Sequence, residues 1–165
     1  MYDIGISLYF LGARVLGLFN HKAAQFVSGR KGLFRTIGEG MSACGDRQTV
    51  WFHCSSVGEF EQARPLIERL RNMSPDKFIV LTFFSPSGYN LRKGYKYADA
   101  VFYLPMDTGR NVRRFLDLVH PSIAIFVKYE FWYNYLIALK ERGVKTYIIS
   151  AIFRPGQIFF RWYGS

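Results

Sequence analysis

The segment His53–Glu59 (HCSSVGE) holds side chains that could carry out acid–base chemistry. It overlaps the end of an apolar run, Thr49–Cys54, of the kind that forms a buried strand. In open parallel sheets, ligands bind beyond the carboxyl ends of the strands, and the first amides of the next helix attract anions. A glutamate placed there could act as a general base, and a glycine lets the backbone approach a ligand. The candidate residues in this segment are Ser55, Ser56, Gly58 and Glu59.

The same spacing also predicts a structural role for two of these residues. Ser56-x-x-Glu59 is a capping box, in which the serine accepts from the amide of residue 59 and the glutamate accepts from the amide of residue 56. Spacing alone favours the capping box over a catalytic carboxylate. The two roles are compatible, because a first helical turn can orient a carboxylate.

Two further strand ends carry polar side chains. The segment Thr82–Gly88 (TFFSPSG) has hydroxyls, Ser87 among them, that could contact a sugar, although Ser-Pro-Ser-Gly is also ordinary turn chemistry. The segment Lys128–Trp132 (KYEFW) places Lys128 and Glu130 beside aromatic side chains, which suits a phosphorylated sugar. The structural alternative is a lysine–glutamate ion pair at the start of a helix, where Glu130 interacts favourably with the helix dipole.

Other reactive side chains favour structural interpretations. His53 is expected to be a hydrogen-bonded structural residue, and Cys44 and Cys54 are expected to be ordinary thiols. Three histidines without close spacing do not predict a zinc site, and the sequence has neither a GxGxxG nor a GxxxxGK[ST] motif. The basic aromatic stretch Tyr89–Tyr97 (YNLRKGYKY) could stack on nucleic acid bases, but it is short.

Strands and helices alternate through the body of the chain. Strands are predicted at 49–54, 78–84, 100–104, 122–127 and 144–150, and helices at 60–71, from about 89 to 97, at 111–119 and at 131–142. Residues 85–88 are predicted to form a turn. Near-continuous apolar strands joined by amphipathic crossovers predict an α/β fold with a Rossmann-like, doubly wound parallel sheet.

The N-terminal segment Ile4–Phe19 is strongly apolar and predicts a helix that precedes the sheet. It is shorter than the roughly 20 apolar residues that span a bilayer, and it lacks the basic start of a secretory signal. Cations follow at Lys22, Arg30, Lys31 and Arg35. An apolar helix followed by cations suits a segment that lies on an anionic membrane, with the remainder on the cytoplasmic side. The alternative is a helix packed against the domain.

The composition narrows the class of protein. The chain has 165 residues, of which 50% are hydrophobic, enough for about one domain with a buried core. Two cysteines are too few for a disulfide-stapled scaffold. The net charge of +10 indicates an anionic partner, which could be nucleic acid, lipid headgroups or a phosphorylated substrate.

Four segments, in order and spacing, resemble the Kdo transferases, which attach 3-deoxy-D-manno-octulosonic acid (Kdo) to lipid A precursors. They are His53–Glu68 (HCSSVGEFEQARPLIE), Thr82–Tyr89 (TFFSPSGY), Tyr103–Asp107 (YLPMD) and Glu130–Gly143 (EFWYNYLIALKERG). Gly29–Phe34 (GRKGLF) resembles the basic element after the membrane-associated helix of that family. The resemblance covers essentially the whole chain. It implies the acceptor-binding half of a GT-B glycosyltransferase, without the half that binds the donor.

The resemblance also implies a reaction and a set of residues. Kdo would pass from CMP-Kdo to the lipid A precursor with inversion, without a metal or other cofactor. Glu59 matches the general base of the family, and Lys128 is kept as a second catalytic candidate. The implied acceptor-binding residues, whose cations would meet phosphates, are Ser55, Ser56, Gly58, Arg30, Lys31, Arg35, Arg64, Ser87 and Glu130.

Three departures from the family pattern indicate a divergent branch. Lys128 stands where many members carry an acidic residue, so the charge is reversed. Tyr133 stands where a proline often follows the tryptophan, and Ser150–Pro155 differs from the commoner form. These departures leave the acceptor details open.

The predicted organisation has three parts. Residues 1–35 form a membrane-associated helix and basic segment, 36–150 the acceptor-binding domain, and 151–165 the start of a connection to a donor-binding domain. The implied partners are the lipid A precursor, CMP-Kdo and the anionic cytoplasmic face of the bacterial inner membrane, with no nucleic acid. The chain is expected to be inactive alone. The alternatives are another GT-B enzyme acting on a lipid-linked sugar, and a basic module that binds nucleic acid or membrane.

Overall fold

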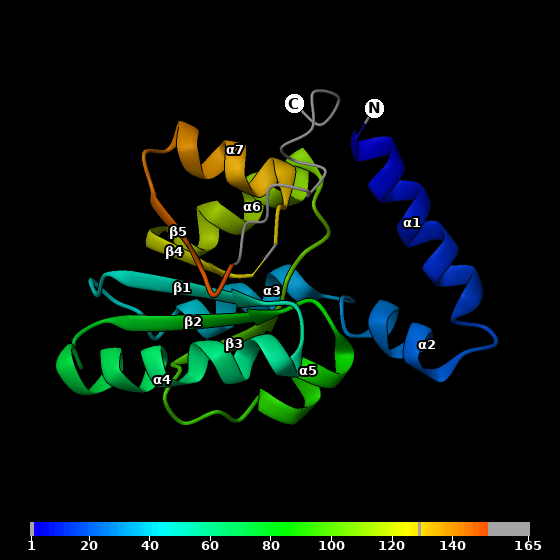
Figure 1. Ribbon diagram of the computed structural model, residues 1–165. Coiled ribbons are helices and arrows are strands. Elements are labelled where there is room, and N and C mark those ends of the chain that lie inside the picture. The colour runs from blue at the N-terminus through cyan, green and yellow to red at the C-terminus, as the bar shows by residue number, and fades with distance from the viewer. Residues whose placement is uncertain (1, 129, 152–165) are drawn as a thin grey trace.

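The computed structural model describes residues 2–128 and 130–151 (Figure 1). Within these ranges, helices and strands alternate from β1 onward, as the sequence predicts. The elements are α1 (Tyr2–Leu16), α2 (His21–Ser28), α3 (Leu33–Met41), β1 (Thr49–Cys54), α4 (Val57–Met73), β2 (Phe78–Phe83), α5 (Pro86–Arg92), β3 (Ala100–Tyr103), α6 (Gly109–Val119), β4 (Pro121–Val127), α7 (Tyr133–Glu141) and β5 (Lys145–Ile149).

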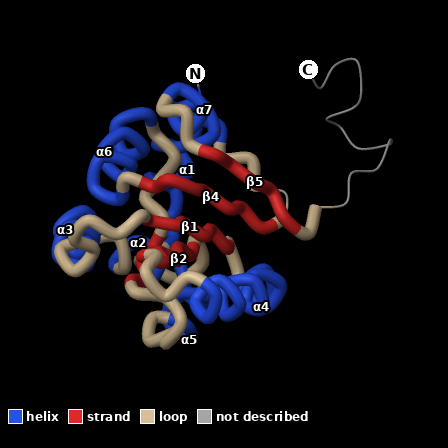
Figure 2. Tube along the Cα trace, turned by 90° about the vertical axis from the view of Figure 1, so that its left-hand side faces the viewer, coloured by secondary structure: helices blue, strands red, loops and turns tan. Residues whose placement is uncertain are grey.

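The strands form one all-parallel sheet in the order β3-β2-β1-β4-β5. Figure 2 shows β2, β1, β4 and β5 in this order. The chain builds outward from β1 to β3, then returns to the other side of β1 and continues to β5. This is the doubly wound arrangement, so the predicted fold class is confirmed. The reversal makes the junction of β1 and β4 the switch point, where sheets of this class bind ligands beyond the carboxyl ends of their strands.

Helices cover both faces of the sheet. On one face, Phe115 of α6 and Tyr135 of α7 pack against Trp51 of β1 in a continuous buried cluster that also includes part of α3. On the other face, Phe60 of α4 lies in a second buried cluster with Phe52 of β1. The central strand β1 is buried along its whole length, because it has a neighbour on each side and a helix layer on each face.

Several helix boundaries differ from the prediction because side chains cap the helices. Helix α4 begins at Val57 rather than at residue 60, directly after the capping residue Ser56. Helix α5 begins at Pro86, so the predicted turn over residues 85–88 is wrong for most of its length. There the Ser85 hydroxyl accepts from the amide of Gly88 at 3.1 Å, and proline suits the first helical position.

Two helices, α2 and α3, lie where the sequence predicts only a basic segment. Helix α3 runs through the predicted boundary between residues 35 and 36 and buries Leu33 and Ile37 in the larger core cluster. Helix α3 therefore packs with the sheet in one buried cluster.

Arg30 joins the α2–α3 connection to the ends of two strands. Its guanidinium donates to the carbonyl oxygens of Leu104 (3.1 Å), Phe84 (2.9 Å) and Phe26 (3.0 Å). It also lies over the Phe26 ring, 3.9 Å from the centroid. Burial lowers the pKa of Arg30 to about 10, which still leaves the side chain charged at neutral pH.

Helix α1 packs against α2 and is anchored at its N-terminal end. Tyr9 and Phe10 contact the Phe26 ring of α2, while the Tyr2 hydroxyl donates to Asp107 at 2.7 Å and the Asp3 carboxylate accepts from the amide of Gly109 at 3.1 Å. None of its residues is buried. Among the described residues, no helix combines the length and the hydropathy needed to cross a membrane.

Candidate active site

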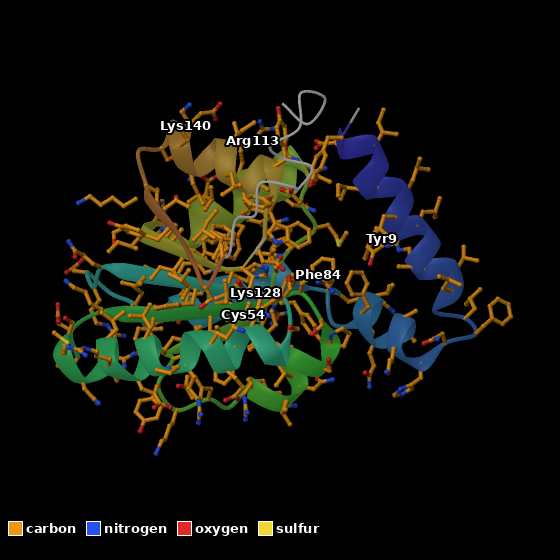
Figure 3. The ribbon with its side chains drawn as sticks, viewed as in Figure 1. Tyr9, Cys54, Phe84, Arg113, Lys128 and Lys140 are labelled. Carbon is orange, nitrogen blue, oxygen red and sulfur yellow. The ribbon has the colours of Figure 1, made fainter. Side chains whose placement is uncertain are left out.

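Two loops meet beyond the switch point of the sheet. The Ser55 hydroxyl, which follows β1, donates to the Glu130 carboxylate, which follows β4. The parallel pairing of β1 with β4 sets this contact, since it aligns the two carboxyl ends. Figure 3 labels Cys54 and Lys128, which mark those two strand ends. The structure thus brings together candidates that lie about 75 residues apart in the sequence.

Glu59 lies in the first turn of α4 and forms the predicted capping box with Ser56. Its carboxylate accepts from the Ser56 amide at 3.0 Å and remains partly exposed. Burial, and next the negative charge of Glu130, raise the pKa of Glu59 above its ordinary value, although hydrogen bonds from the Ser56 and Ser55 backbone oppose this. A carboxylate with a raised pKa is a stronger base than an ordinary glutamate.

Glu130 is held differently from Glu59. It accepts from the Trp132 indole at 2.6 Å and from the Ser55 hydroxyl, and its Oε2 lies 3.6 Å from Nε2 of His53. Burial tends to raise the pKa of Glu130, but the interactions with His53, Ser55 and Trp132 outweigh burial and lower the pKa below its ordinary value. The two carboxylates of the site therefore differ in their protonation behaviour, as acid–base sites require.

Lys128 follows β4 directly and has a left-handed backbone conformation, with φ of 63°. Such a conformation is unfavourable for a residue with a side chain and is often found at functional sites. The Lys128 amide donates to the carbonyl oxygen of Ile149 at 2.8 Å, which fixes the loop against the end of β5. Within the described residues, the predicted Lys128–Glu130 ion pair does not form, and Glu130 lies ahead of α7 rather than in it.

The other predicted acceptor-binding residues lie outside this contact network. Ser87 is exposed in α5, Lys31 is exposed ahead of α3, and Arg35 pairs with Glu39 on the surface of α3. Arg64 pairs with Glu61 one turn along α4. Arg30 is part of the fold, as described above, and it also lines a cavity of about 350 Å³ between α1 and the segment after β3.

The sequence does not reveal that Trp51, Thr82 and Trp132 are hydrogen-bonded to the groups of this site. Trp51 and Thr82 are buried in neighbouring strands, where apolar periodicity hides their hydrogen-bonding groups. Trp132 lies within the Glu-Phe-Trp segment that the sequence singled out, and only the fold shows that its indole faces Glu130. Among the described residues, no group of three or more histidine, cysteine, aspartate or glutamate side chains is arranged to hold a metal ion.

A family model described as 3-deoxy-D-manno-octulosonic-acid transferase (kdotransferase) matches residues 27–162. The chain belongs to the Kdo transferase family. The predicted resemblance is therefore confirmed, and the described part of the match contains both site glutamates.

Curated relatives are similar to parts of this Kdo transferase family member. The 3-deoxy-D-manno-octulosonic acid transferase of Haemophilus influenzae is 31% identical over 88% of this chain and 33% of its own length. Its namesake from Chlamydia muridarum is 32% identical over 64% of this chain and 25% of its own length. The Aquifex aeolicus protein of the same name is 34% identical over 55% of this chain and 25% of its own length. The chain thus spans about a third or less of the length of these relatives.

Gly58, beside Glu59, provides a test of what this candidate site requires from its fold. A Cβ atom at Gly58 would meet only the Ser56 hydroxyl, at 4.0 Å, so packing does not require glycine there. We expect Gly58→Ala to raise the free energy of unfolding by about 0.5–1 kcal/mol, because alanine favours helix more than glycine does. Urea unfolding measures this change.

Gly29→Ala is the matched control for Gly58→Ala. A Cβ atom at Gly29 would lie 2.4 Å from the Tyr103 ring, so we expect this variant to be destabilised. If Gly58→Ala were also destabilised, the fold itself would require glycine at position 58, contrary to the expectation from the space around it.

Proposed function

We propose that this chain is the acceptor-binding half of an enzyme that transfers Kdo from CMP-Kdo to a lipid A precursor in lipopolysaccharide synthesis. Family membership supports the reaction class. The observation that carries the proposal is the Glu59 carboxylate, which lies at the switch point, is partly exposed, and has its pKa raised by burial and by Glu130. The matched segments cover 33% and 25% of two relatives' own lengths, which leaves room in those proteins for a donor-binding domain.

In this proposal Glu59 is the general base. A sugar hydroxyl of the acceptor loses its proton to Glu59 as its oxygen attacks the anomeric carbon of Kdo. The bond to the phosphate of CMP breaks on the opposite face, so the configuration inverts. A positioned base of this kind contributes about 10²–10⁴-fold to rate. The Glu59 side chain is partly exposed, which leaves its carboxylate accessible to the acceptor.

The neighbouring groups have supporting roles in this reaction. Glu130, held ionised by its donors, keeps the pKa of Glu59 raised. Lys128 supplies a positive charge at the same strand ends, and we propose that it stabilises charge on the departing phosphate. The hydroxyls of Ser55, Ser56 and Ser87, together with the exposed cations Lys31, Arg35 and Arg64, are proposed to contact the acceptor. No cofactor is required by this proposal.

Replacement of Glu59 by glutamine tests the general base directly. In the full-length protein with CMP-Kdo and lipid A precursor, we expect Glu59→Gln to lower turnover by at least about 10²-fold, because the amide cannot accept a proton. Acceptor binding and thermal stability should be retained, since glutamine can preserve the capping box. Near-normal turnover would exclude Glu59 as the base.

Glu61→Gln is the control for this experiment. Glu61 lies on the same helix and pairs with Arg64 and Arg92 at the surface, away from Glu130. We expect this variant to keep near-normal turnover. An equal loss in both variants would indicate a general effect of charge on α4.

We also propose that α1 and the turn that follows it lie on the anionic cytoplasmic face of the bacterial inner membrane. The exposed face of α1 carries Leu8 at 62% exposure, and the turn carries Phe19 at 86%. Lys22 is exposed just beyond this turn. Apolar side chains followed by cations suit the interface of an anionic bilayer, and the net charge of +10 agrees with this location.

Vesicle binding tests the membrane proposal. Replacing Leu8 by serine should weaken sedimentation with phosphatidylglycerol vesicles by roughly tenfold, because burying one leucine contributes about 1.5–3 kcal/mol. Leu91→Ser is the matched control, since Leu91 is 61% exposed on α5 and far from α1 in the sequence. Equal binding by both variants would argue against α1 as the membrane contact.

The structure offers little support for the nucleic-acid alternative. Two half-buried rings of Tyr89–Tyr97 pack against other rings: Tyr89 stacks on Tyr103 with centroids 4.1 Å apart, and Tyr95 packs edge-on against Phe60 at 4.9 Å. The Tyr95 hydroxyl donates to Glu68 at 3.2 Å. Rings in these contacts are not presented as a stacking platform, so we propose no nucleic acid partner.

A further inference from the structure

A chain of hydrogen-bonding groups runs from the interior of the sheet to the site. The Trp51 indole donates to the Thr82 hydroxyl at 2.8 Å, and the same hydroxyl lies 2.9 Å from Nδ1 of His53. All three side chains are fully buried. On the other side of the imidazole, Nε2 lies 3.6 Å from the Glu130 carboxylate and 3.4 Å from the Ser55 hydroxyl.

The geometry favours one tautomer of His53. An indole can only donate, so the Thr82 oxygen accepts from Trp51 and has its own single proton left to give. That proton can go to Nδ1 of His53 at 2.9 Å or to the carbonyl oxygen of Phe52 at 3.4 Å, and the shorter contact is the better one. With Nδ1 accepting, the ring proton lies on Nε2 and faces Glu130.

The opposite tautomer leaves an unfavourable contact at each end. Nδ1 would then donate to Thr82 and force the Thr82 proton onto the longer contact with Phe52. The lone pair of the fully buried Nε2 would face a carboxylate oxygen of Glu130. Buried polar groups are arranged to avoid such pairings.

We propose that His53 is a positioning residue, held by Trp51 and Thr82 as the Nε2–H tautomer, that holds the Glu130 carboxylate in place at the switch point. Trp51 and Thr82 belong to two central strands, so they give the imidazole a rigid support. Ser55 and Trp132, the other donors to Glu130, belong to loops. This role rests on the proposed function of Glu59 and extends it to a buried side chain that touches no substrate.

Several charged and titratable groups share this environment. Glu130 faces His53 from the loop after β4. Glu59, in α4, interacts electrostatically with both Glu130 and His53. The Cys54 thiol is neutral, because burial, with smaller effects of Glu59 and Glu130, raises its pKa. Lys128 lies at the end of β4. Misplacing one carboxylate by about 1 Å in a site of this kind can cost around 10²-fold in rate.

Two substitutions of similar size test whether His53 positions Glu130 or only fills space in the core. The amide nitrogen of glutamine can replace Nε2 of histidine, so His53→Gln keeps a donor toward Glu130. Asparagine reaches only the place of Nδ1, so His53→Asn keeps the contact with Thr82 and loses the donor. In the full-length protein we expect His53→Asn to lower kcat by roughly 10–100-fold, His53→Gln to stay within about fivefold, and the KM for acceptor to change little in either.

The outcomes of these substitutions are distinct. Equal activity in His53→Asn and His53→Gln, or losses that follow the melting temperatures of the two variants, would overturn the positioning role. Absence of Kdo transfer by the wild-type protein would refute the proposed function. The tautomer of His53 would then still be tested by spectroscopy.

Nitrogen-15 NMR of histidine-labelled protein tests the tautomer without any activity. The chain has three histidines, so the His53 signals are identified by their loss in His53→Gln. We expect a protonated Nε2 and an unprotonated Nδ1 at neutral pH, and a mixture of tautomers in Thr82→Val. A predominant Nδ1–H form, or a doubly protonated ring, would overturn the proposed hydrogen-bond arrangement.

Discussion

The parallel pairing of β1 with β4 is the contact on which the site depends. Strands β2 and β3 lie on one side of β1, and β4 pairs with the other side of β1. This pairing brings Ser55 and Glu130 into direct contact and places Glu59 near a second carboxylate. Two like charges that repel each other disfavour ionisation of both groups, and the donors around Glu130 make it the one that ionises more readily.

The N-terminal helices are joined to the same region through aromatic packing. The Arg30 guanidinium holds the carbonyl oxygens of Phe26 and Phe84, and the Phe84 ring contacts both Phe26 (5.1 Å) and Trp132 (4.8 Å). Trp132 in turn donates to Glu130. The contact between α2 and the sheet is thus continuous with the packing that supports one of the site carboxylates.

The sequence predicts the sheet well, because its strands are near-continuous apolar runs and its crossover helices are strongly periodic. It predicts Glu59 and Glu130 as candidates, because polar residues at strand ends stand out against those runs. It does not predict α2 and α3, whose short segments mix apolar and basic residues. It does not predict that Arg30 donates to the carbonyl oxygens of Phe26, Phe84 and Leu104, because two of these residues are distant in the sequence. The supporting role of His53 depends on Thr82, 29 residues away, and on Glu130, so only the folded chain reveals it.

Glu59 is a more basic carboxylate than an ordinary glutamate, because it is partly buried and feels the negative charge of Glu130. Titration of the Glu59 carboxyl carbon by carbon-13 NMR, in the wild-type protein and in Glu130→Gln, measures this directly. The wild-type midpoint should lie above the ordinary glutamate value of about 4.3, and Glu130→Gln should lower it, because removing a nearby negative charge favours ionisation. A Glu59 midpoint at or below the ordinary value, or one that Glu130→Gln leaves unchanged, would contradict this account of the site.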